Sequence, residues 1–320
     1  MAKMRFIDNI SVNGVIKMSL RTDLANEAFE HHASRGGARD GIKSESREIN
    51  KDIKVTKVEI LTDEAAQRLG KQKGTYITIT AEYISNRDSE HHGLIGRAVS
   101  EQLKELLPRP EKGRTVLVVG LGNSRMTPDA LGPKTVNKLM ITRHLLQMIP
   151  DQVDSRVNSV CAIAPGVLGV TGIESSDIIT ALCEKIKPQY IIAIDSLAAA
   201  SAQRIKDTIQ MSNTGIAPGA GVGNKRCGIN RETLGVPVYA LGIPMVVYAS
   251  SVLEDFLERN NDGRMRLSAE DYINENIREL IVTPKEIDVI IDDCSRMLAD
   301  GLNLALHDGV NMEEIRDFMY

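Results

Sequence analysis

The sequence predicts an α/β fold in which a mostly parallel central sheet is covered by helices on both faces. Two observations predict it. Short apolar runs alternate with longer segments that have helical character, and strands alternating with helices form parallel sheets with both faces covered; the runs are 115–119, 157–164, 190–194 and 236–241. The chain has 320 residues, of which 42% are hydrophobic, enough for one large domain.

The residues before this core predict a smaller β-containing element. Residues 1 to about 50 carry dense charge and a Gly-Gly pair, and we expect them to be poorly structured. Alternating stretches within 55–83 predict a pair of antiparallel strands. A helix over about 93–107 should follow and end at Pro108.

The central region, 115–250, is predicted to carry the site-bearing loops. After its first strand, Thr127 and Pro128 are suited to the cap and first position of a long helix that reaches about Met148. Further helices are expected at 175–185 and from about Pro244. A C-terminal helix over 284–307 should close the fold, with Gly301 as a candidate interruption.

Composition excludes several classes of partner. A formal net charge of −4 provides no basic field for nucleic acid or an anionic membrane surface. The N-terminus lacks the apolar stretch of a signal peptide, and no apolar run is long enough to cross a bilayer. The four cysteines form no C-x-x-C pair, which disfavours a zinc ribbon. We therefore expect a cytoplasmic protein that binds neither nucleic acid nor membrane.

Two aspartates stand where an open parallel sheet places its ligands, beyond the carboxyl ends of strands. Asp129 follows the loop after the first strand of the core, and Asp195 ends another strand. Two carboxylates brought together share a proton, and such a pair activates water and protonates a leaving amine. The alternatives are structural: Asp129 would complement a helix dipole, and Asp195 would cap the next helix.

The same loops also allow other functional interpretations. Gly120-Leu121-Gly122 resembles a dinucleotide-binding turn but has Arg125 at its third glycine position, and the glycine-rich loop before Lys225 lacks the G-K-[ST] ending of a phosphate loop. A non-catalytic nucleotide-binding or assembly protein is thus one alternative. Another is an enzyme whose two aspartates bind a divalent, oxygen-preferring metal ion. No G-x-S-x-G or H-E-x-x-H motif is present.

Five segments together resemble the germination protease family of spore-forming bacteria, in order and over most of the chain. They are 127–133, 164–177, 192–199, 221–226 and 282–286. The resemblance implies a fold like that of hydrogenase maturation proteases, a homotetramer without a cofactor, and synthesis as a zymogen in the forespore. It also implies an endopeptidase that cuts small acid-soluble spore proteins after Glu or Asp and before a hydrophobic residue followed by Ala.

The resemblance also assigns roles to residues. Asp129 and Asp195 match the aspartates proposed to be catalytic in the family. Supporting positions without a chemical step are expected at Glu174, Asp177, Asn123 and Lys225. Two positions depart from the family, because Asn213 and Ala217 stand where members carry Asp and His. The segment 258–280 is also shorter than in Bacillus-type members, which puts any lid or assembly role of that segment in question.

The segment 21–25, Arg-Thr-Asp-Leu-Ala, is similar to the self-processing site of the family. It predicts a cut between Asp23 and Leu24, which divides the chain into a propeptide, 1–23, and a single protease domain, 24–320. The surrounding polar, glycine-bearing stretch is expected to be accessible. The alternative is that Thr22 and Asp23 cap a helix that continues through Ala28.

Overall fold

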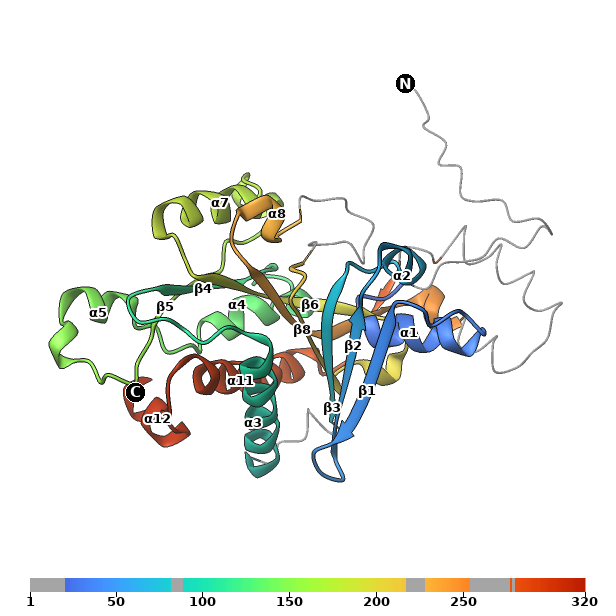
Figure 1. Cartoon of the computed structure of the whole chain (residues 1–320), viewed down its shortest axis with the longest axis horizontal. Helices are drawn as coiled ribbons and strands as arrows, with labels where there is room; N and C mark the ends of the chain where they lie inside the picture. The colour runs from blue at the N-terminus through green and yellow to red at the C-terminus, as the bar shows by residue number, and fades with distance from the viewer. Residues whose placement is uncertain (1–20, 82–88, 217–227, 254–276, 278–279, 320) are drawn as a thin grey trace, which may run out of the picture.

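A computed structural model describes residues 21–81, 89–216, 228–253, 277 and 280–319, and these build one mixed sheet between two layers of helices (Figure 1). The strands are β1 (Ile42–Glu48), β2 (Ile53–Ile60), β3 (Gly74–Ala81), β4 (Thr115–Gly120), β5 (Ser159–Ile163), β6 (Tyr190–Ala199), β7 (Thr208–Ser212), β8 (Val238–Tyr248) and β9 (Ile281–Val282). Their order is β1-β2-β3-β7-β8-β6-β4-β5, and β9 pairs with β8. The α/β prediction is confirmed.

The parallel pairing is confined to the predicted core. Strands β8, β6, β4 and β5 pair in parallel, whereas β1, β2, β3, β7 and β8 pair antiparallel. The N-terminal strands therefore form no separate element, because β3 joins the core through β7, with Ile79 opposite Ile209. This continuity places a loop from the N-terminal half beside the ends of the core strands.

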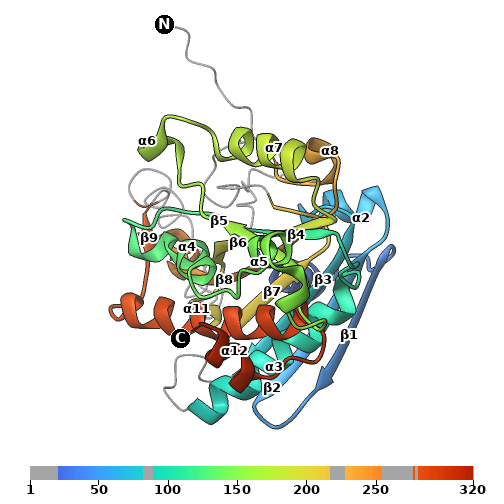
Figure 2. The ribbon, with the colours of Figure 1, turned by 90° about the vertical axis from the view of Figure 1, so that its left-hand side faces the viewer.

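Helices cover both faces of the sheet. They are α1 (Ala25–Ser34), α2 (Asp63–Leu69), α3 (Ser89–Leu106), α4 (Leu131–Val136), α5 (Arg143–Met148), α6 (Leu168–Thr171), α7 (Ser175–Ile186), α8 (Arg231–Leu234), α11 (Ile287–Leu306) and α12 (Met312–Met319). Figure 2 shows α7 and α8 on one side of the sheet and α3, α11 and α12 on the other. Alternate residues of β6 pack against the helices on opposite faces of the sheet. Ile192 packs toward α3 and α11, and Ile191 packs toward α7. None of the described helices combines the length and the apolar character needed to span a bilayer.

The N-terminal region is more ordered than predicted. The stretch from residue 21 to about 50 contains α1 and β1. Strand β1 has almost no buried side chain, so its sequence lacks the apolar alternation by which a strand is recognised. Strand β1 is held in the sheet by antiparallel pairing of seven residues with β2, from Ile42 opposite Ile60 to Glu48 opposite Lys54.

The predicted long helix from Thr127 to Met148 is wrong. A 3₁₀ turn, η1 (Thr127–Asp129), is followed by the short α4 and α5. The chain leaves the helical path because distant groups take its backbone hydrogen bonds. The Met140 N–H donates to Asn303 Oδ1 at 2.9 Å, and the Thr142 N–H donates to the Val160 carbonyl at 3.1 Å.

The helix predicted from about Pro244 begins later, at Ala249, because β8 continues to Tyr248. Its partner β6 likewise extends past residue 194 to Ala199. Pro244 has no N–H for the ladder, and the β6–β8 register shifts just beyond it, between Leu197 and Ala198. The extension of β6 places residues 196–198 in the lining of the cleft described below.

The C-terminal helix is confirmed as α11, and Gly301 does not interrupt it. A side chain at Gly301 would lie 2.5 Å from Val99 Cγ1 and 3.0 Å from the Gly96 carbonyl of α3. The glycine therefore permits the close crossing of α3 and α11 rather than a break.

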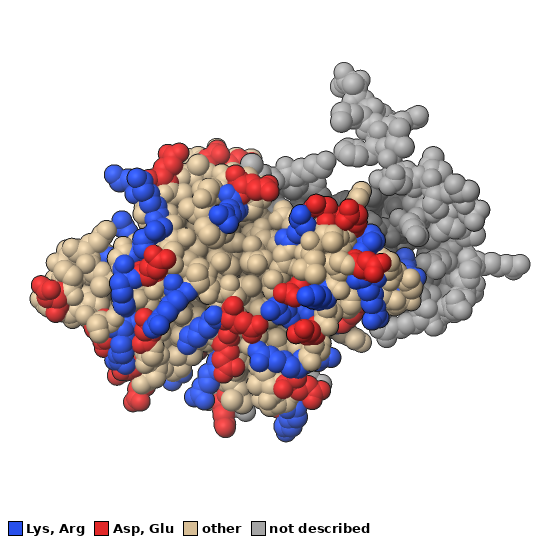
Figure 3. Space-filling view, in the orientation of Figure 1, with Lys and Arg blue, Asp and Glu red and all other residues tan. Residues whose placement is uncertain are grey.

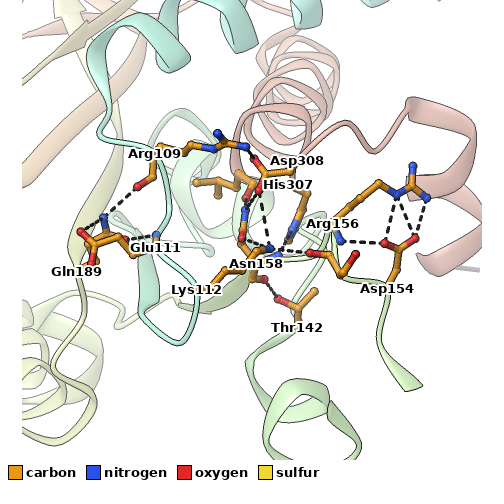
Figure 4. Close-up of polar contacts among 12 residues, drawn as sticks. Arg109, Glu111, Lys112, Thr142, Asp154, Arg156, Asn158, Gln189, His307 and Asp308 are labelled. Carbon is orange, nitrogen blue, oxygen red and sulfur yellow. Dashed lines mark hydrogen bonds and ion pairs between the residues drawn. The ribbon is translucent and has the colours of Figure 1, made fainter. Parts of the chain in front are cut away.

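A polar cluster ties the end of α11 to the edge strand β5 (Figure 4). The Asn158 side-chain amide donates to the Leu306 carbonyl at 2.8 Å, and the Asn158 N–H donates to His307 Nδ1 at 3.1 Å. Lys112 Nζ donates to Asn158 Oδ1 at 2.9 Å. Burial lowers the pKa of His307 to about 4, so this ring is a neutral structural acceptor.

Surface charge is mixed. On the face shown in Figure 3, the described Lys and Arg side chains are interspersed with Asp and Glu, without a broad patch of one sign. This distribution gives that face no basic footprint of the kind that nucleic-acid binding requires.

Candidate active site

A cleft of about 980 Å³ opens at the carboxyl ends of β4 and β6. Both Asp129 and Asp195 line it. The two residues come from different segments, since Asp129 ends η1 after β4 and Asp195 lies within β6. Both aspartates therefore line one cleft at the strand ends, as the parallel-sheet rule predicts, and their action as a pair stays a prediction.

Asp129 is positioned by the glycine loop before it. The Asn123 N–H donates to Asp129 Oδ2 at 2.8 Å. Gly122 has a φ of +110°, and a side chain there would lie 2.1 Å from the Asp129 carbonyl oxygen. Gly122 thus lets the loop fold directly onto the aspartate, which gives this glycine a packing role independent of any nucleotide.

Asp195 is 9% exposed, and its Oδ1 accepts a hydrogen bond from the Ser196 N–H at 2.9 Å. The alternative that it caps the following helix is wrong, because β6 continues for four residues beyond it. Asp195 instead lies in the middle of β6 and lines the cleft. The Ser196 hydroxyl beside it is buried and has no hydrogen-bond partner among the described residues.

The supporting residues divide into two groups. Asn123 lines the cleft. Glu174 occupies the N-cap position of α7 without a side-chain capping bond, Asp177 is exposed in its first turn, and neither lines the cleft. Lys225 lies outside the described residues, as does Ala217. Asn213 is exposed at the end of β7, where its Oδ1 accepts from the Thr75 N–H at 2.9 Å.

The expected self-processing segment enters the same cleft. Asp23 lines it, the Asp23 N–H donates to the Ala198 carbonyl, and the Ala198 N–H donates to Asp23 Oδ2, both at 2.8 Å. Leu24 is 1% exposed and packs against Leu197, Ala199 and Ile216. The expectation of an accessible segment is wrong for residues 24–28, which are buried because they fit between β6 and the N-terminal strands.

The capping alternative for this segment is also wrong. Helix α1 begins at Ala25, its N-cap residue is Leu24, and no side chain caps it. The Thr22 hydroxyl instead accepts from the Leu24 N–H at 3.0 Å. The backbone at Leu24, with φ −80° and ψ 120°, is extended.

Two further side chains of the cleft, those of Lys71 and Gln210, lie outside the sequence motifs. Lys71 Nζ donates to the Thr22 carbonyl at 2.7 Å. Gln210 Nε2 donates to the Asp23 carbonyl at 3.0 Å, and Gln210 Oε1 accepts from the Ala25 N–H at 2.6 Å. Lys71 belongs to no motif. Gln210 offers one weak indication, a polar residue between Ile209 and Met211 in a buried strand.

Burial shifts the pKa values of Asp23 and Lys71, the charged pair in this cleft. It raises the pKa of Asp23, an effect opposed by the positive charge of Lys71 and by the hydrogen bond from Ala198. It lowers the pKa of Lys71, an effect opposed by the carboxylates of Asp23 and Glu27. Each charge therefore favours the charged form of the other.

A catalytic zinc ion is poorly matched by the described part of the cleft. The described residues contain no group of three or more His, Cys, Asp or Glu side chains able to share an ion. Asp129 and Asp195 give two carboxylates, and catalytic zinc sites take three protein ligands. We therefore derive no chemical step through a metal.

Comparison with known proteins gives a consistent family match. The family model described as "Germination protease" matches residues 21–260 and 261–319. A germination protease of Clostridium perfringens (strain ATCC 13124) is 44% identical over 323 residues, covering 94% of this chain and 99% of that protein. One from Clostridium acetobutylicum is 40% identical over 325 residues, covering 94% and 99%.

A germination protease of Geobacillus sp. (strain WCH70) is 37% identical over 364 residues, covering 94% of this chain and 97% of that protein. The aligned length exceeds the 320 residues of this chain, so the relative has residues without a counterpart here. The break in the family match falls between residues 260 and 261, within the segment predicted to be short.

Among solved structures, the chain is similar to the NiFe hydrogenase maturation protease HycI from Thermococcus kodakarensis KOD1. The TM-score is 0.36 with 13% identity, over 64% of this chain and 98% of that one. That score is too low for the likeness to support a conclusion.

Proposed function

The chain belongs to the germination protease family and is a peptidase, and from this premise we propose that it is an endopeptidase made as a self-processing zymogen. Its working pair is Asp129 and Asp195. Its first substrate is its own Asp23–Leu24 bond, and its later substrates are small acid-soluble spore proteins cut after an acidic residue.

The presence of the expected cleavage segment in the cleft that holds both aspartates is the observation that carries the proposal. Asp23 pairs with β6 through Ala198, three residues along the strand from Asp195. The main chain at Leu24 is extended, the form in which peptides add to strands. A tethered segment also has a high effective concentration, which favours its cleavage before that of any free protein.

In the proposed reaction, one aspartate is ionised and the other is protonated. The ionised carboxylate takes a proton from water as the water oxygen bonds to the carbonyl carbon. The protonated carboxyl then gives its proton to the amide nitrogen as the C–N bond breaks. No proton is gained or lost overall, and the products are a carboxyl group and an amine. The N–H donors of Asn123 and Ser196 keep the two carboxylates oriented.

The remaining parts of the proposal concern substrate, assembly and place of action. The names of the relatives support an action during spore germination. We propose that the protein acts in the spore core as a homotetramer and without a resident cofactor. A divalent ion held by the two aspartates is the competing mechanism, which a chelator distinguishes.

The test is to incubate the processed protein with a purified small acid-soluble spore protein and to identify the products by mass spectrometry. The proposal predicts cuts after Glu or Asp, before a hydrophobic residue that is followed by Ala. An intact substrate after prolonged incubation, or cuts without an acidic residue before the bond, would refute it. A basic protein of similar size that lacks such a sequence is the matched control.

A further inference from the structure

Lys71 owes its place in the cleft to the turn that ends α2. Gly70 adopts a left-handed conformation with φ +62°, and the Lys71 N–H donates to the Ala66 carbonyl at 3.1 Å. This hydrogen bond is part of a Schellman-type helix end, in which glycine takes the left-handed position. The chain therefore reverses at Gly70 and brings Lys71 from the N-terminal half of the protein to the cleft of the core.

The acidic side chain at position 23 meets two favourable partners there. One is the Ala198 N–H, which donates to Asp23 Oδ2, and the other is the positive charge of Lys71. A carboxylate that loses water needs such partners, because an unpaired buried charge is costly. The Ala198 N–H would also serve a neutral amide oxygen, so the positive charge of Lys71 is the feature that distinguishes an acidic residue from its amide.

Gln210 holds the main chain on both sides of Leu24. Its amide nitrogen donates to the Asp23 carbonyl, and its amide oxygen accepts from the Ala25 N–H. The carbonyl that receives this bond belongs to the peptide bond expected to be cut. The positive charge of Lys71 and the main-chain hydrogen bond of Gln210 therefore both act on Asp23.

Glu27 is the second carboxylate whose charge acts on Lys71. It accepts from the Ala200 N–H at 2.8 Å, from the Ser201 N–H at 3.1 Å and from the Thr22 hydroxyl. Glu27 lies on the C-terminal side of the expected cut. It therefore stays with the processed chain and keeps its two backbone N–H donors. Thr22 and Asp23 leave with the propeptide, which releases the Ala198 N–H and the Gln210 amide nitrogen and removes from Lys71 both the Thr22 carbonyl and the Asp23 carboxylate.

We propose that Lys71, together with the Ala198 N–H and Gln210, forms the subsite that selects an acidic residue immediately before the cut bond. Asp23 of the chain occupies this subsite first, and the acidic residue of a substrate peptide occupies it after processing. The inference rests on the proposed function and adds to it the residues that set specificity.

The experiment compares two peptides that differ only at the residue before the cut, Glu in one and Gln in the other. Processed wild type, Lys71→Gln and Lys73→Gln are assayed for kcat/KM on both. Lys73 is the matched control, since it lies two residues away, pairs with Asp63 at 2.9 Å on the surface and does not line the cleft. A full-length variant that does not process itself is processed in trans by a trace of wild type.

Wild type and Lys73→Gln should prefer the Glu peptide, and Lys71→Gln should lose roughly ten- to hundredfold of that preference, the order of magnitude for removing an opposite charge close to a buried carboxylate. Gln-peptide cleavage by Lys71→Gln should persist, which shows that the variant is folded and active. An unchanged Glu-to-Gln ratio in Lys71→Gln would overturn the inference. If wild type cuts neither peptide, the proposed function itself fails.

A second arm uses self-processing of the full-length chain. Asp23→Asn should slow cleavage at position 23, and adding Lys71→Gln should restore part of the rate, because the neutral amide then no longer faces a buried cation. If Lys71 served only to hold the propeptide, Lys71→Gln alone would accelerate self-processing and leave peptide preference unchanged. That outcome would also overturn the inference.

Discussion

Asp129 and Asp195 each accept a hydrogen bond from a nearby backbone N–H, at 2.8 and 2.9 Å, so both carboxylates are held in fixed orientations. An amide retains an acceptor oxygen and the same volume, but it does not exchange a proton. The two roles of these residues, structural acceptor and acid–base group, are therefore separable by substitution.

Asp129→Asn and Asp195→Asn should each lower peptide cleavage at least a hundredfold, the lower end of what general acid–base groups contribute. The melting temperature should stay close to that of wild type, because the substituted amide keeps an oxygen that accepts from the N–H of Asn123 or Ser196. Turnover is measured with a fluorogenic peptide and stability by thermal unfolding. Near-normal turnover in both variants would exclude the pair.

His307 provides a residue-scale test of stability. It is 1% exposed, and its pKa falls from 6.5 to about 4 on folding because of burial. The folded ring stays neutral while the unfolded ring binds a proton, so stability is lost as pH falls from about 6.5 toward 4, by up to about 3 kcal/mol. In His307→Gln, denaturant unfolding should show a shallower loss over this range. The exposed His144→Gln serves as control, and equal slopes in wild type and His307→Gln would contradict the assignment.

At the scale of elements, the prediction succeeded where local pattern decides structure. Strands such as β4 are apolar on both faces, so their sequence alone identifies them. It failed where distant groups decide: the break between α4 and α5 depends on Asn303 and Val160, and β1 depends on pairing with β2. Gly301 likewise has a role that appears only when α3 is in place.

Two glycines of the α3–α11 pair give opposite expectations for one substitution. Gly301→Ala should destabilise by about 1–3 kcal/mol, because its methyl group would meet Val99 and the Gly96 carbonyl. Gly93→Ala in α3 meets nothing within 4 Å and should stabilise by up to about 1 kcal/mol. Denaturant unfolding measures both. The same sign for the two variants would refute this description of the crossing.

At the scale of the whole molecule, the cleft joins parts of the chain that no motif connects. Asp129 and Asp195 were identifiable because a family resemblance and the parallel-sheet rule both point to them. Lys71 and Gln210 were not, because they reach the cleft only through the continuous sheet that links β3 to β7 and the core. A sequence pattern shows which residues are close along the chain, whereas this site is made by residues that are distant in sequence and close in space.

The mechanism of the whole enzyme is tested by chelation and pH. A metal-free aspartate pair should be insensitive to a strong chelator and show a bell-shaped rate profile with a mildly acidic optimum. Activity that disappears with chelator and returns with a divalent ion would replace the pair by a metal mechanism. The measurement is kcat/KM of the processed protein across pH, with and without chelator.

The central claim is that the aspartate cleft cuts the segment it holds. Intact-mass and N-terminal analysis of purified full-length chain, sampled during incubation, tests it directly. The account predicts a new N-terminus at Leu24 in wild type and retention of residues 1–23 in Asp129→Asn, Asp195→Asn and Asp23→Ala. A new N-terminus at any other residue, or processing of the aspartate variants at the wild-type rate, would contradict it.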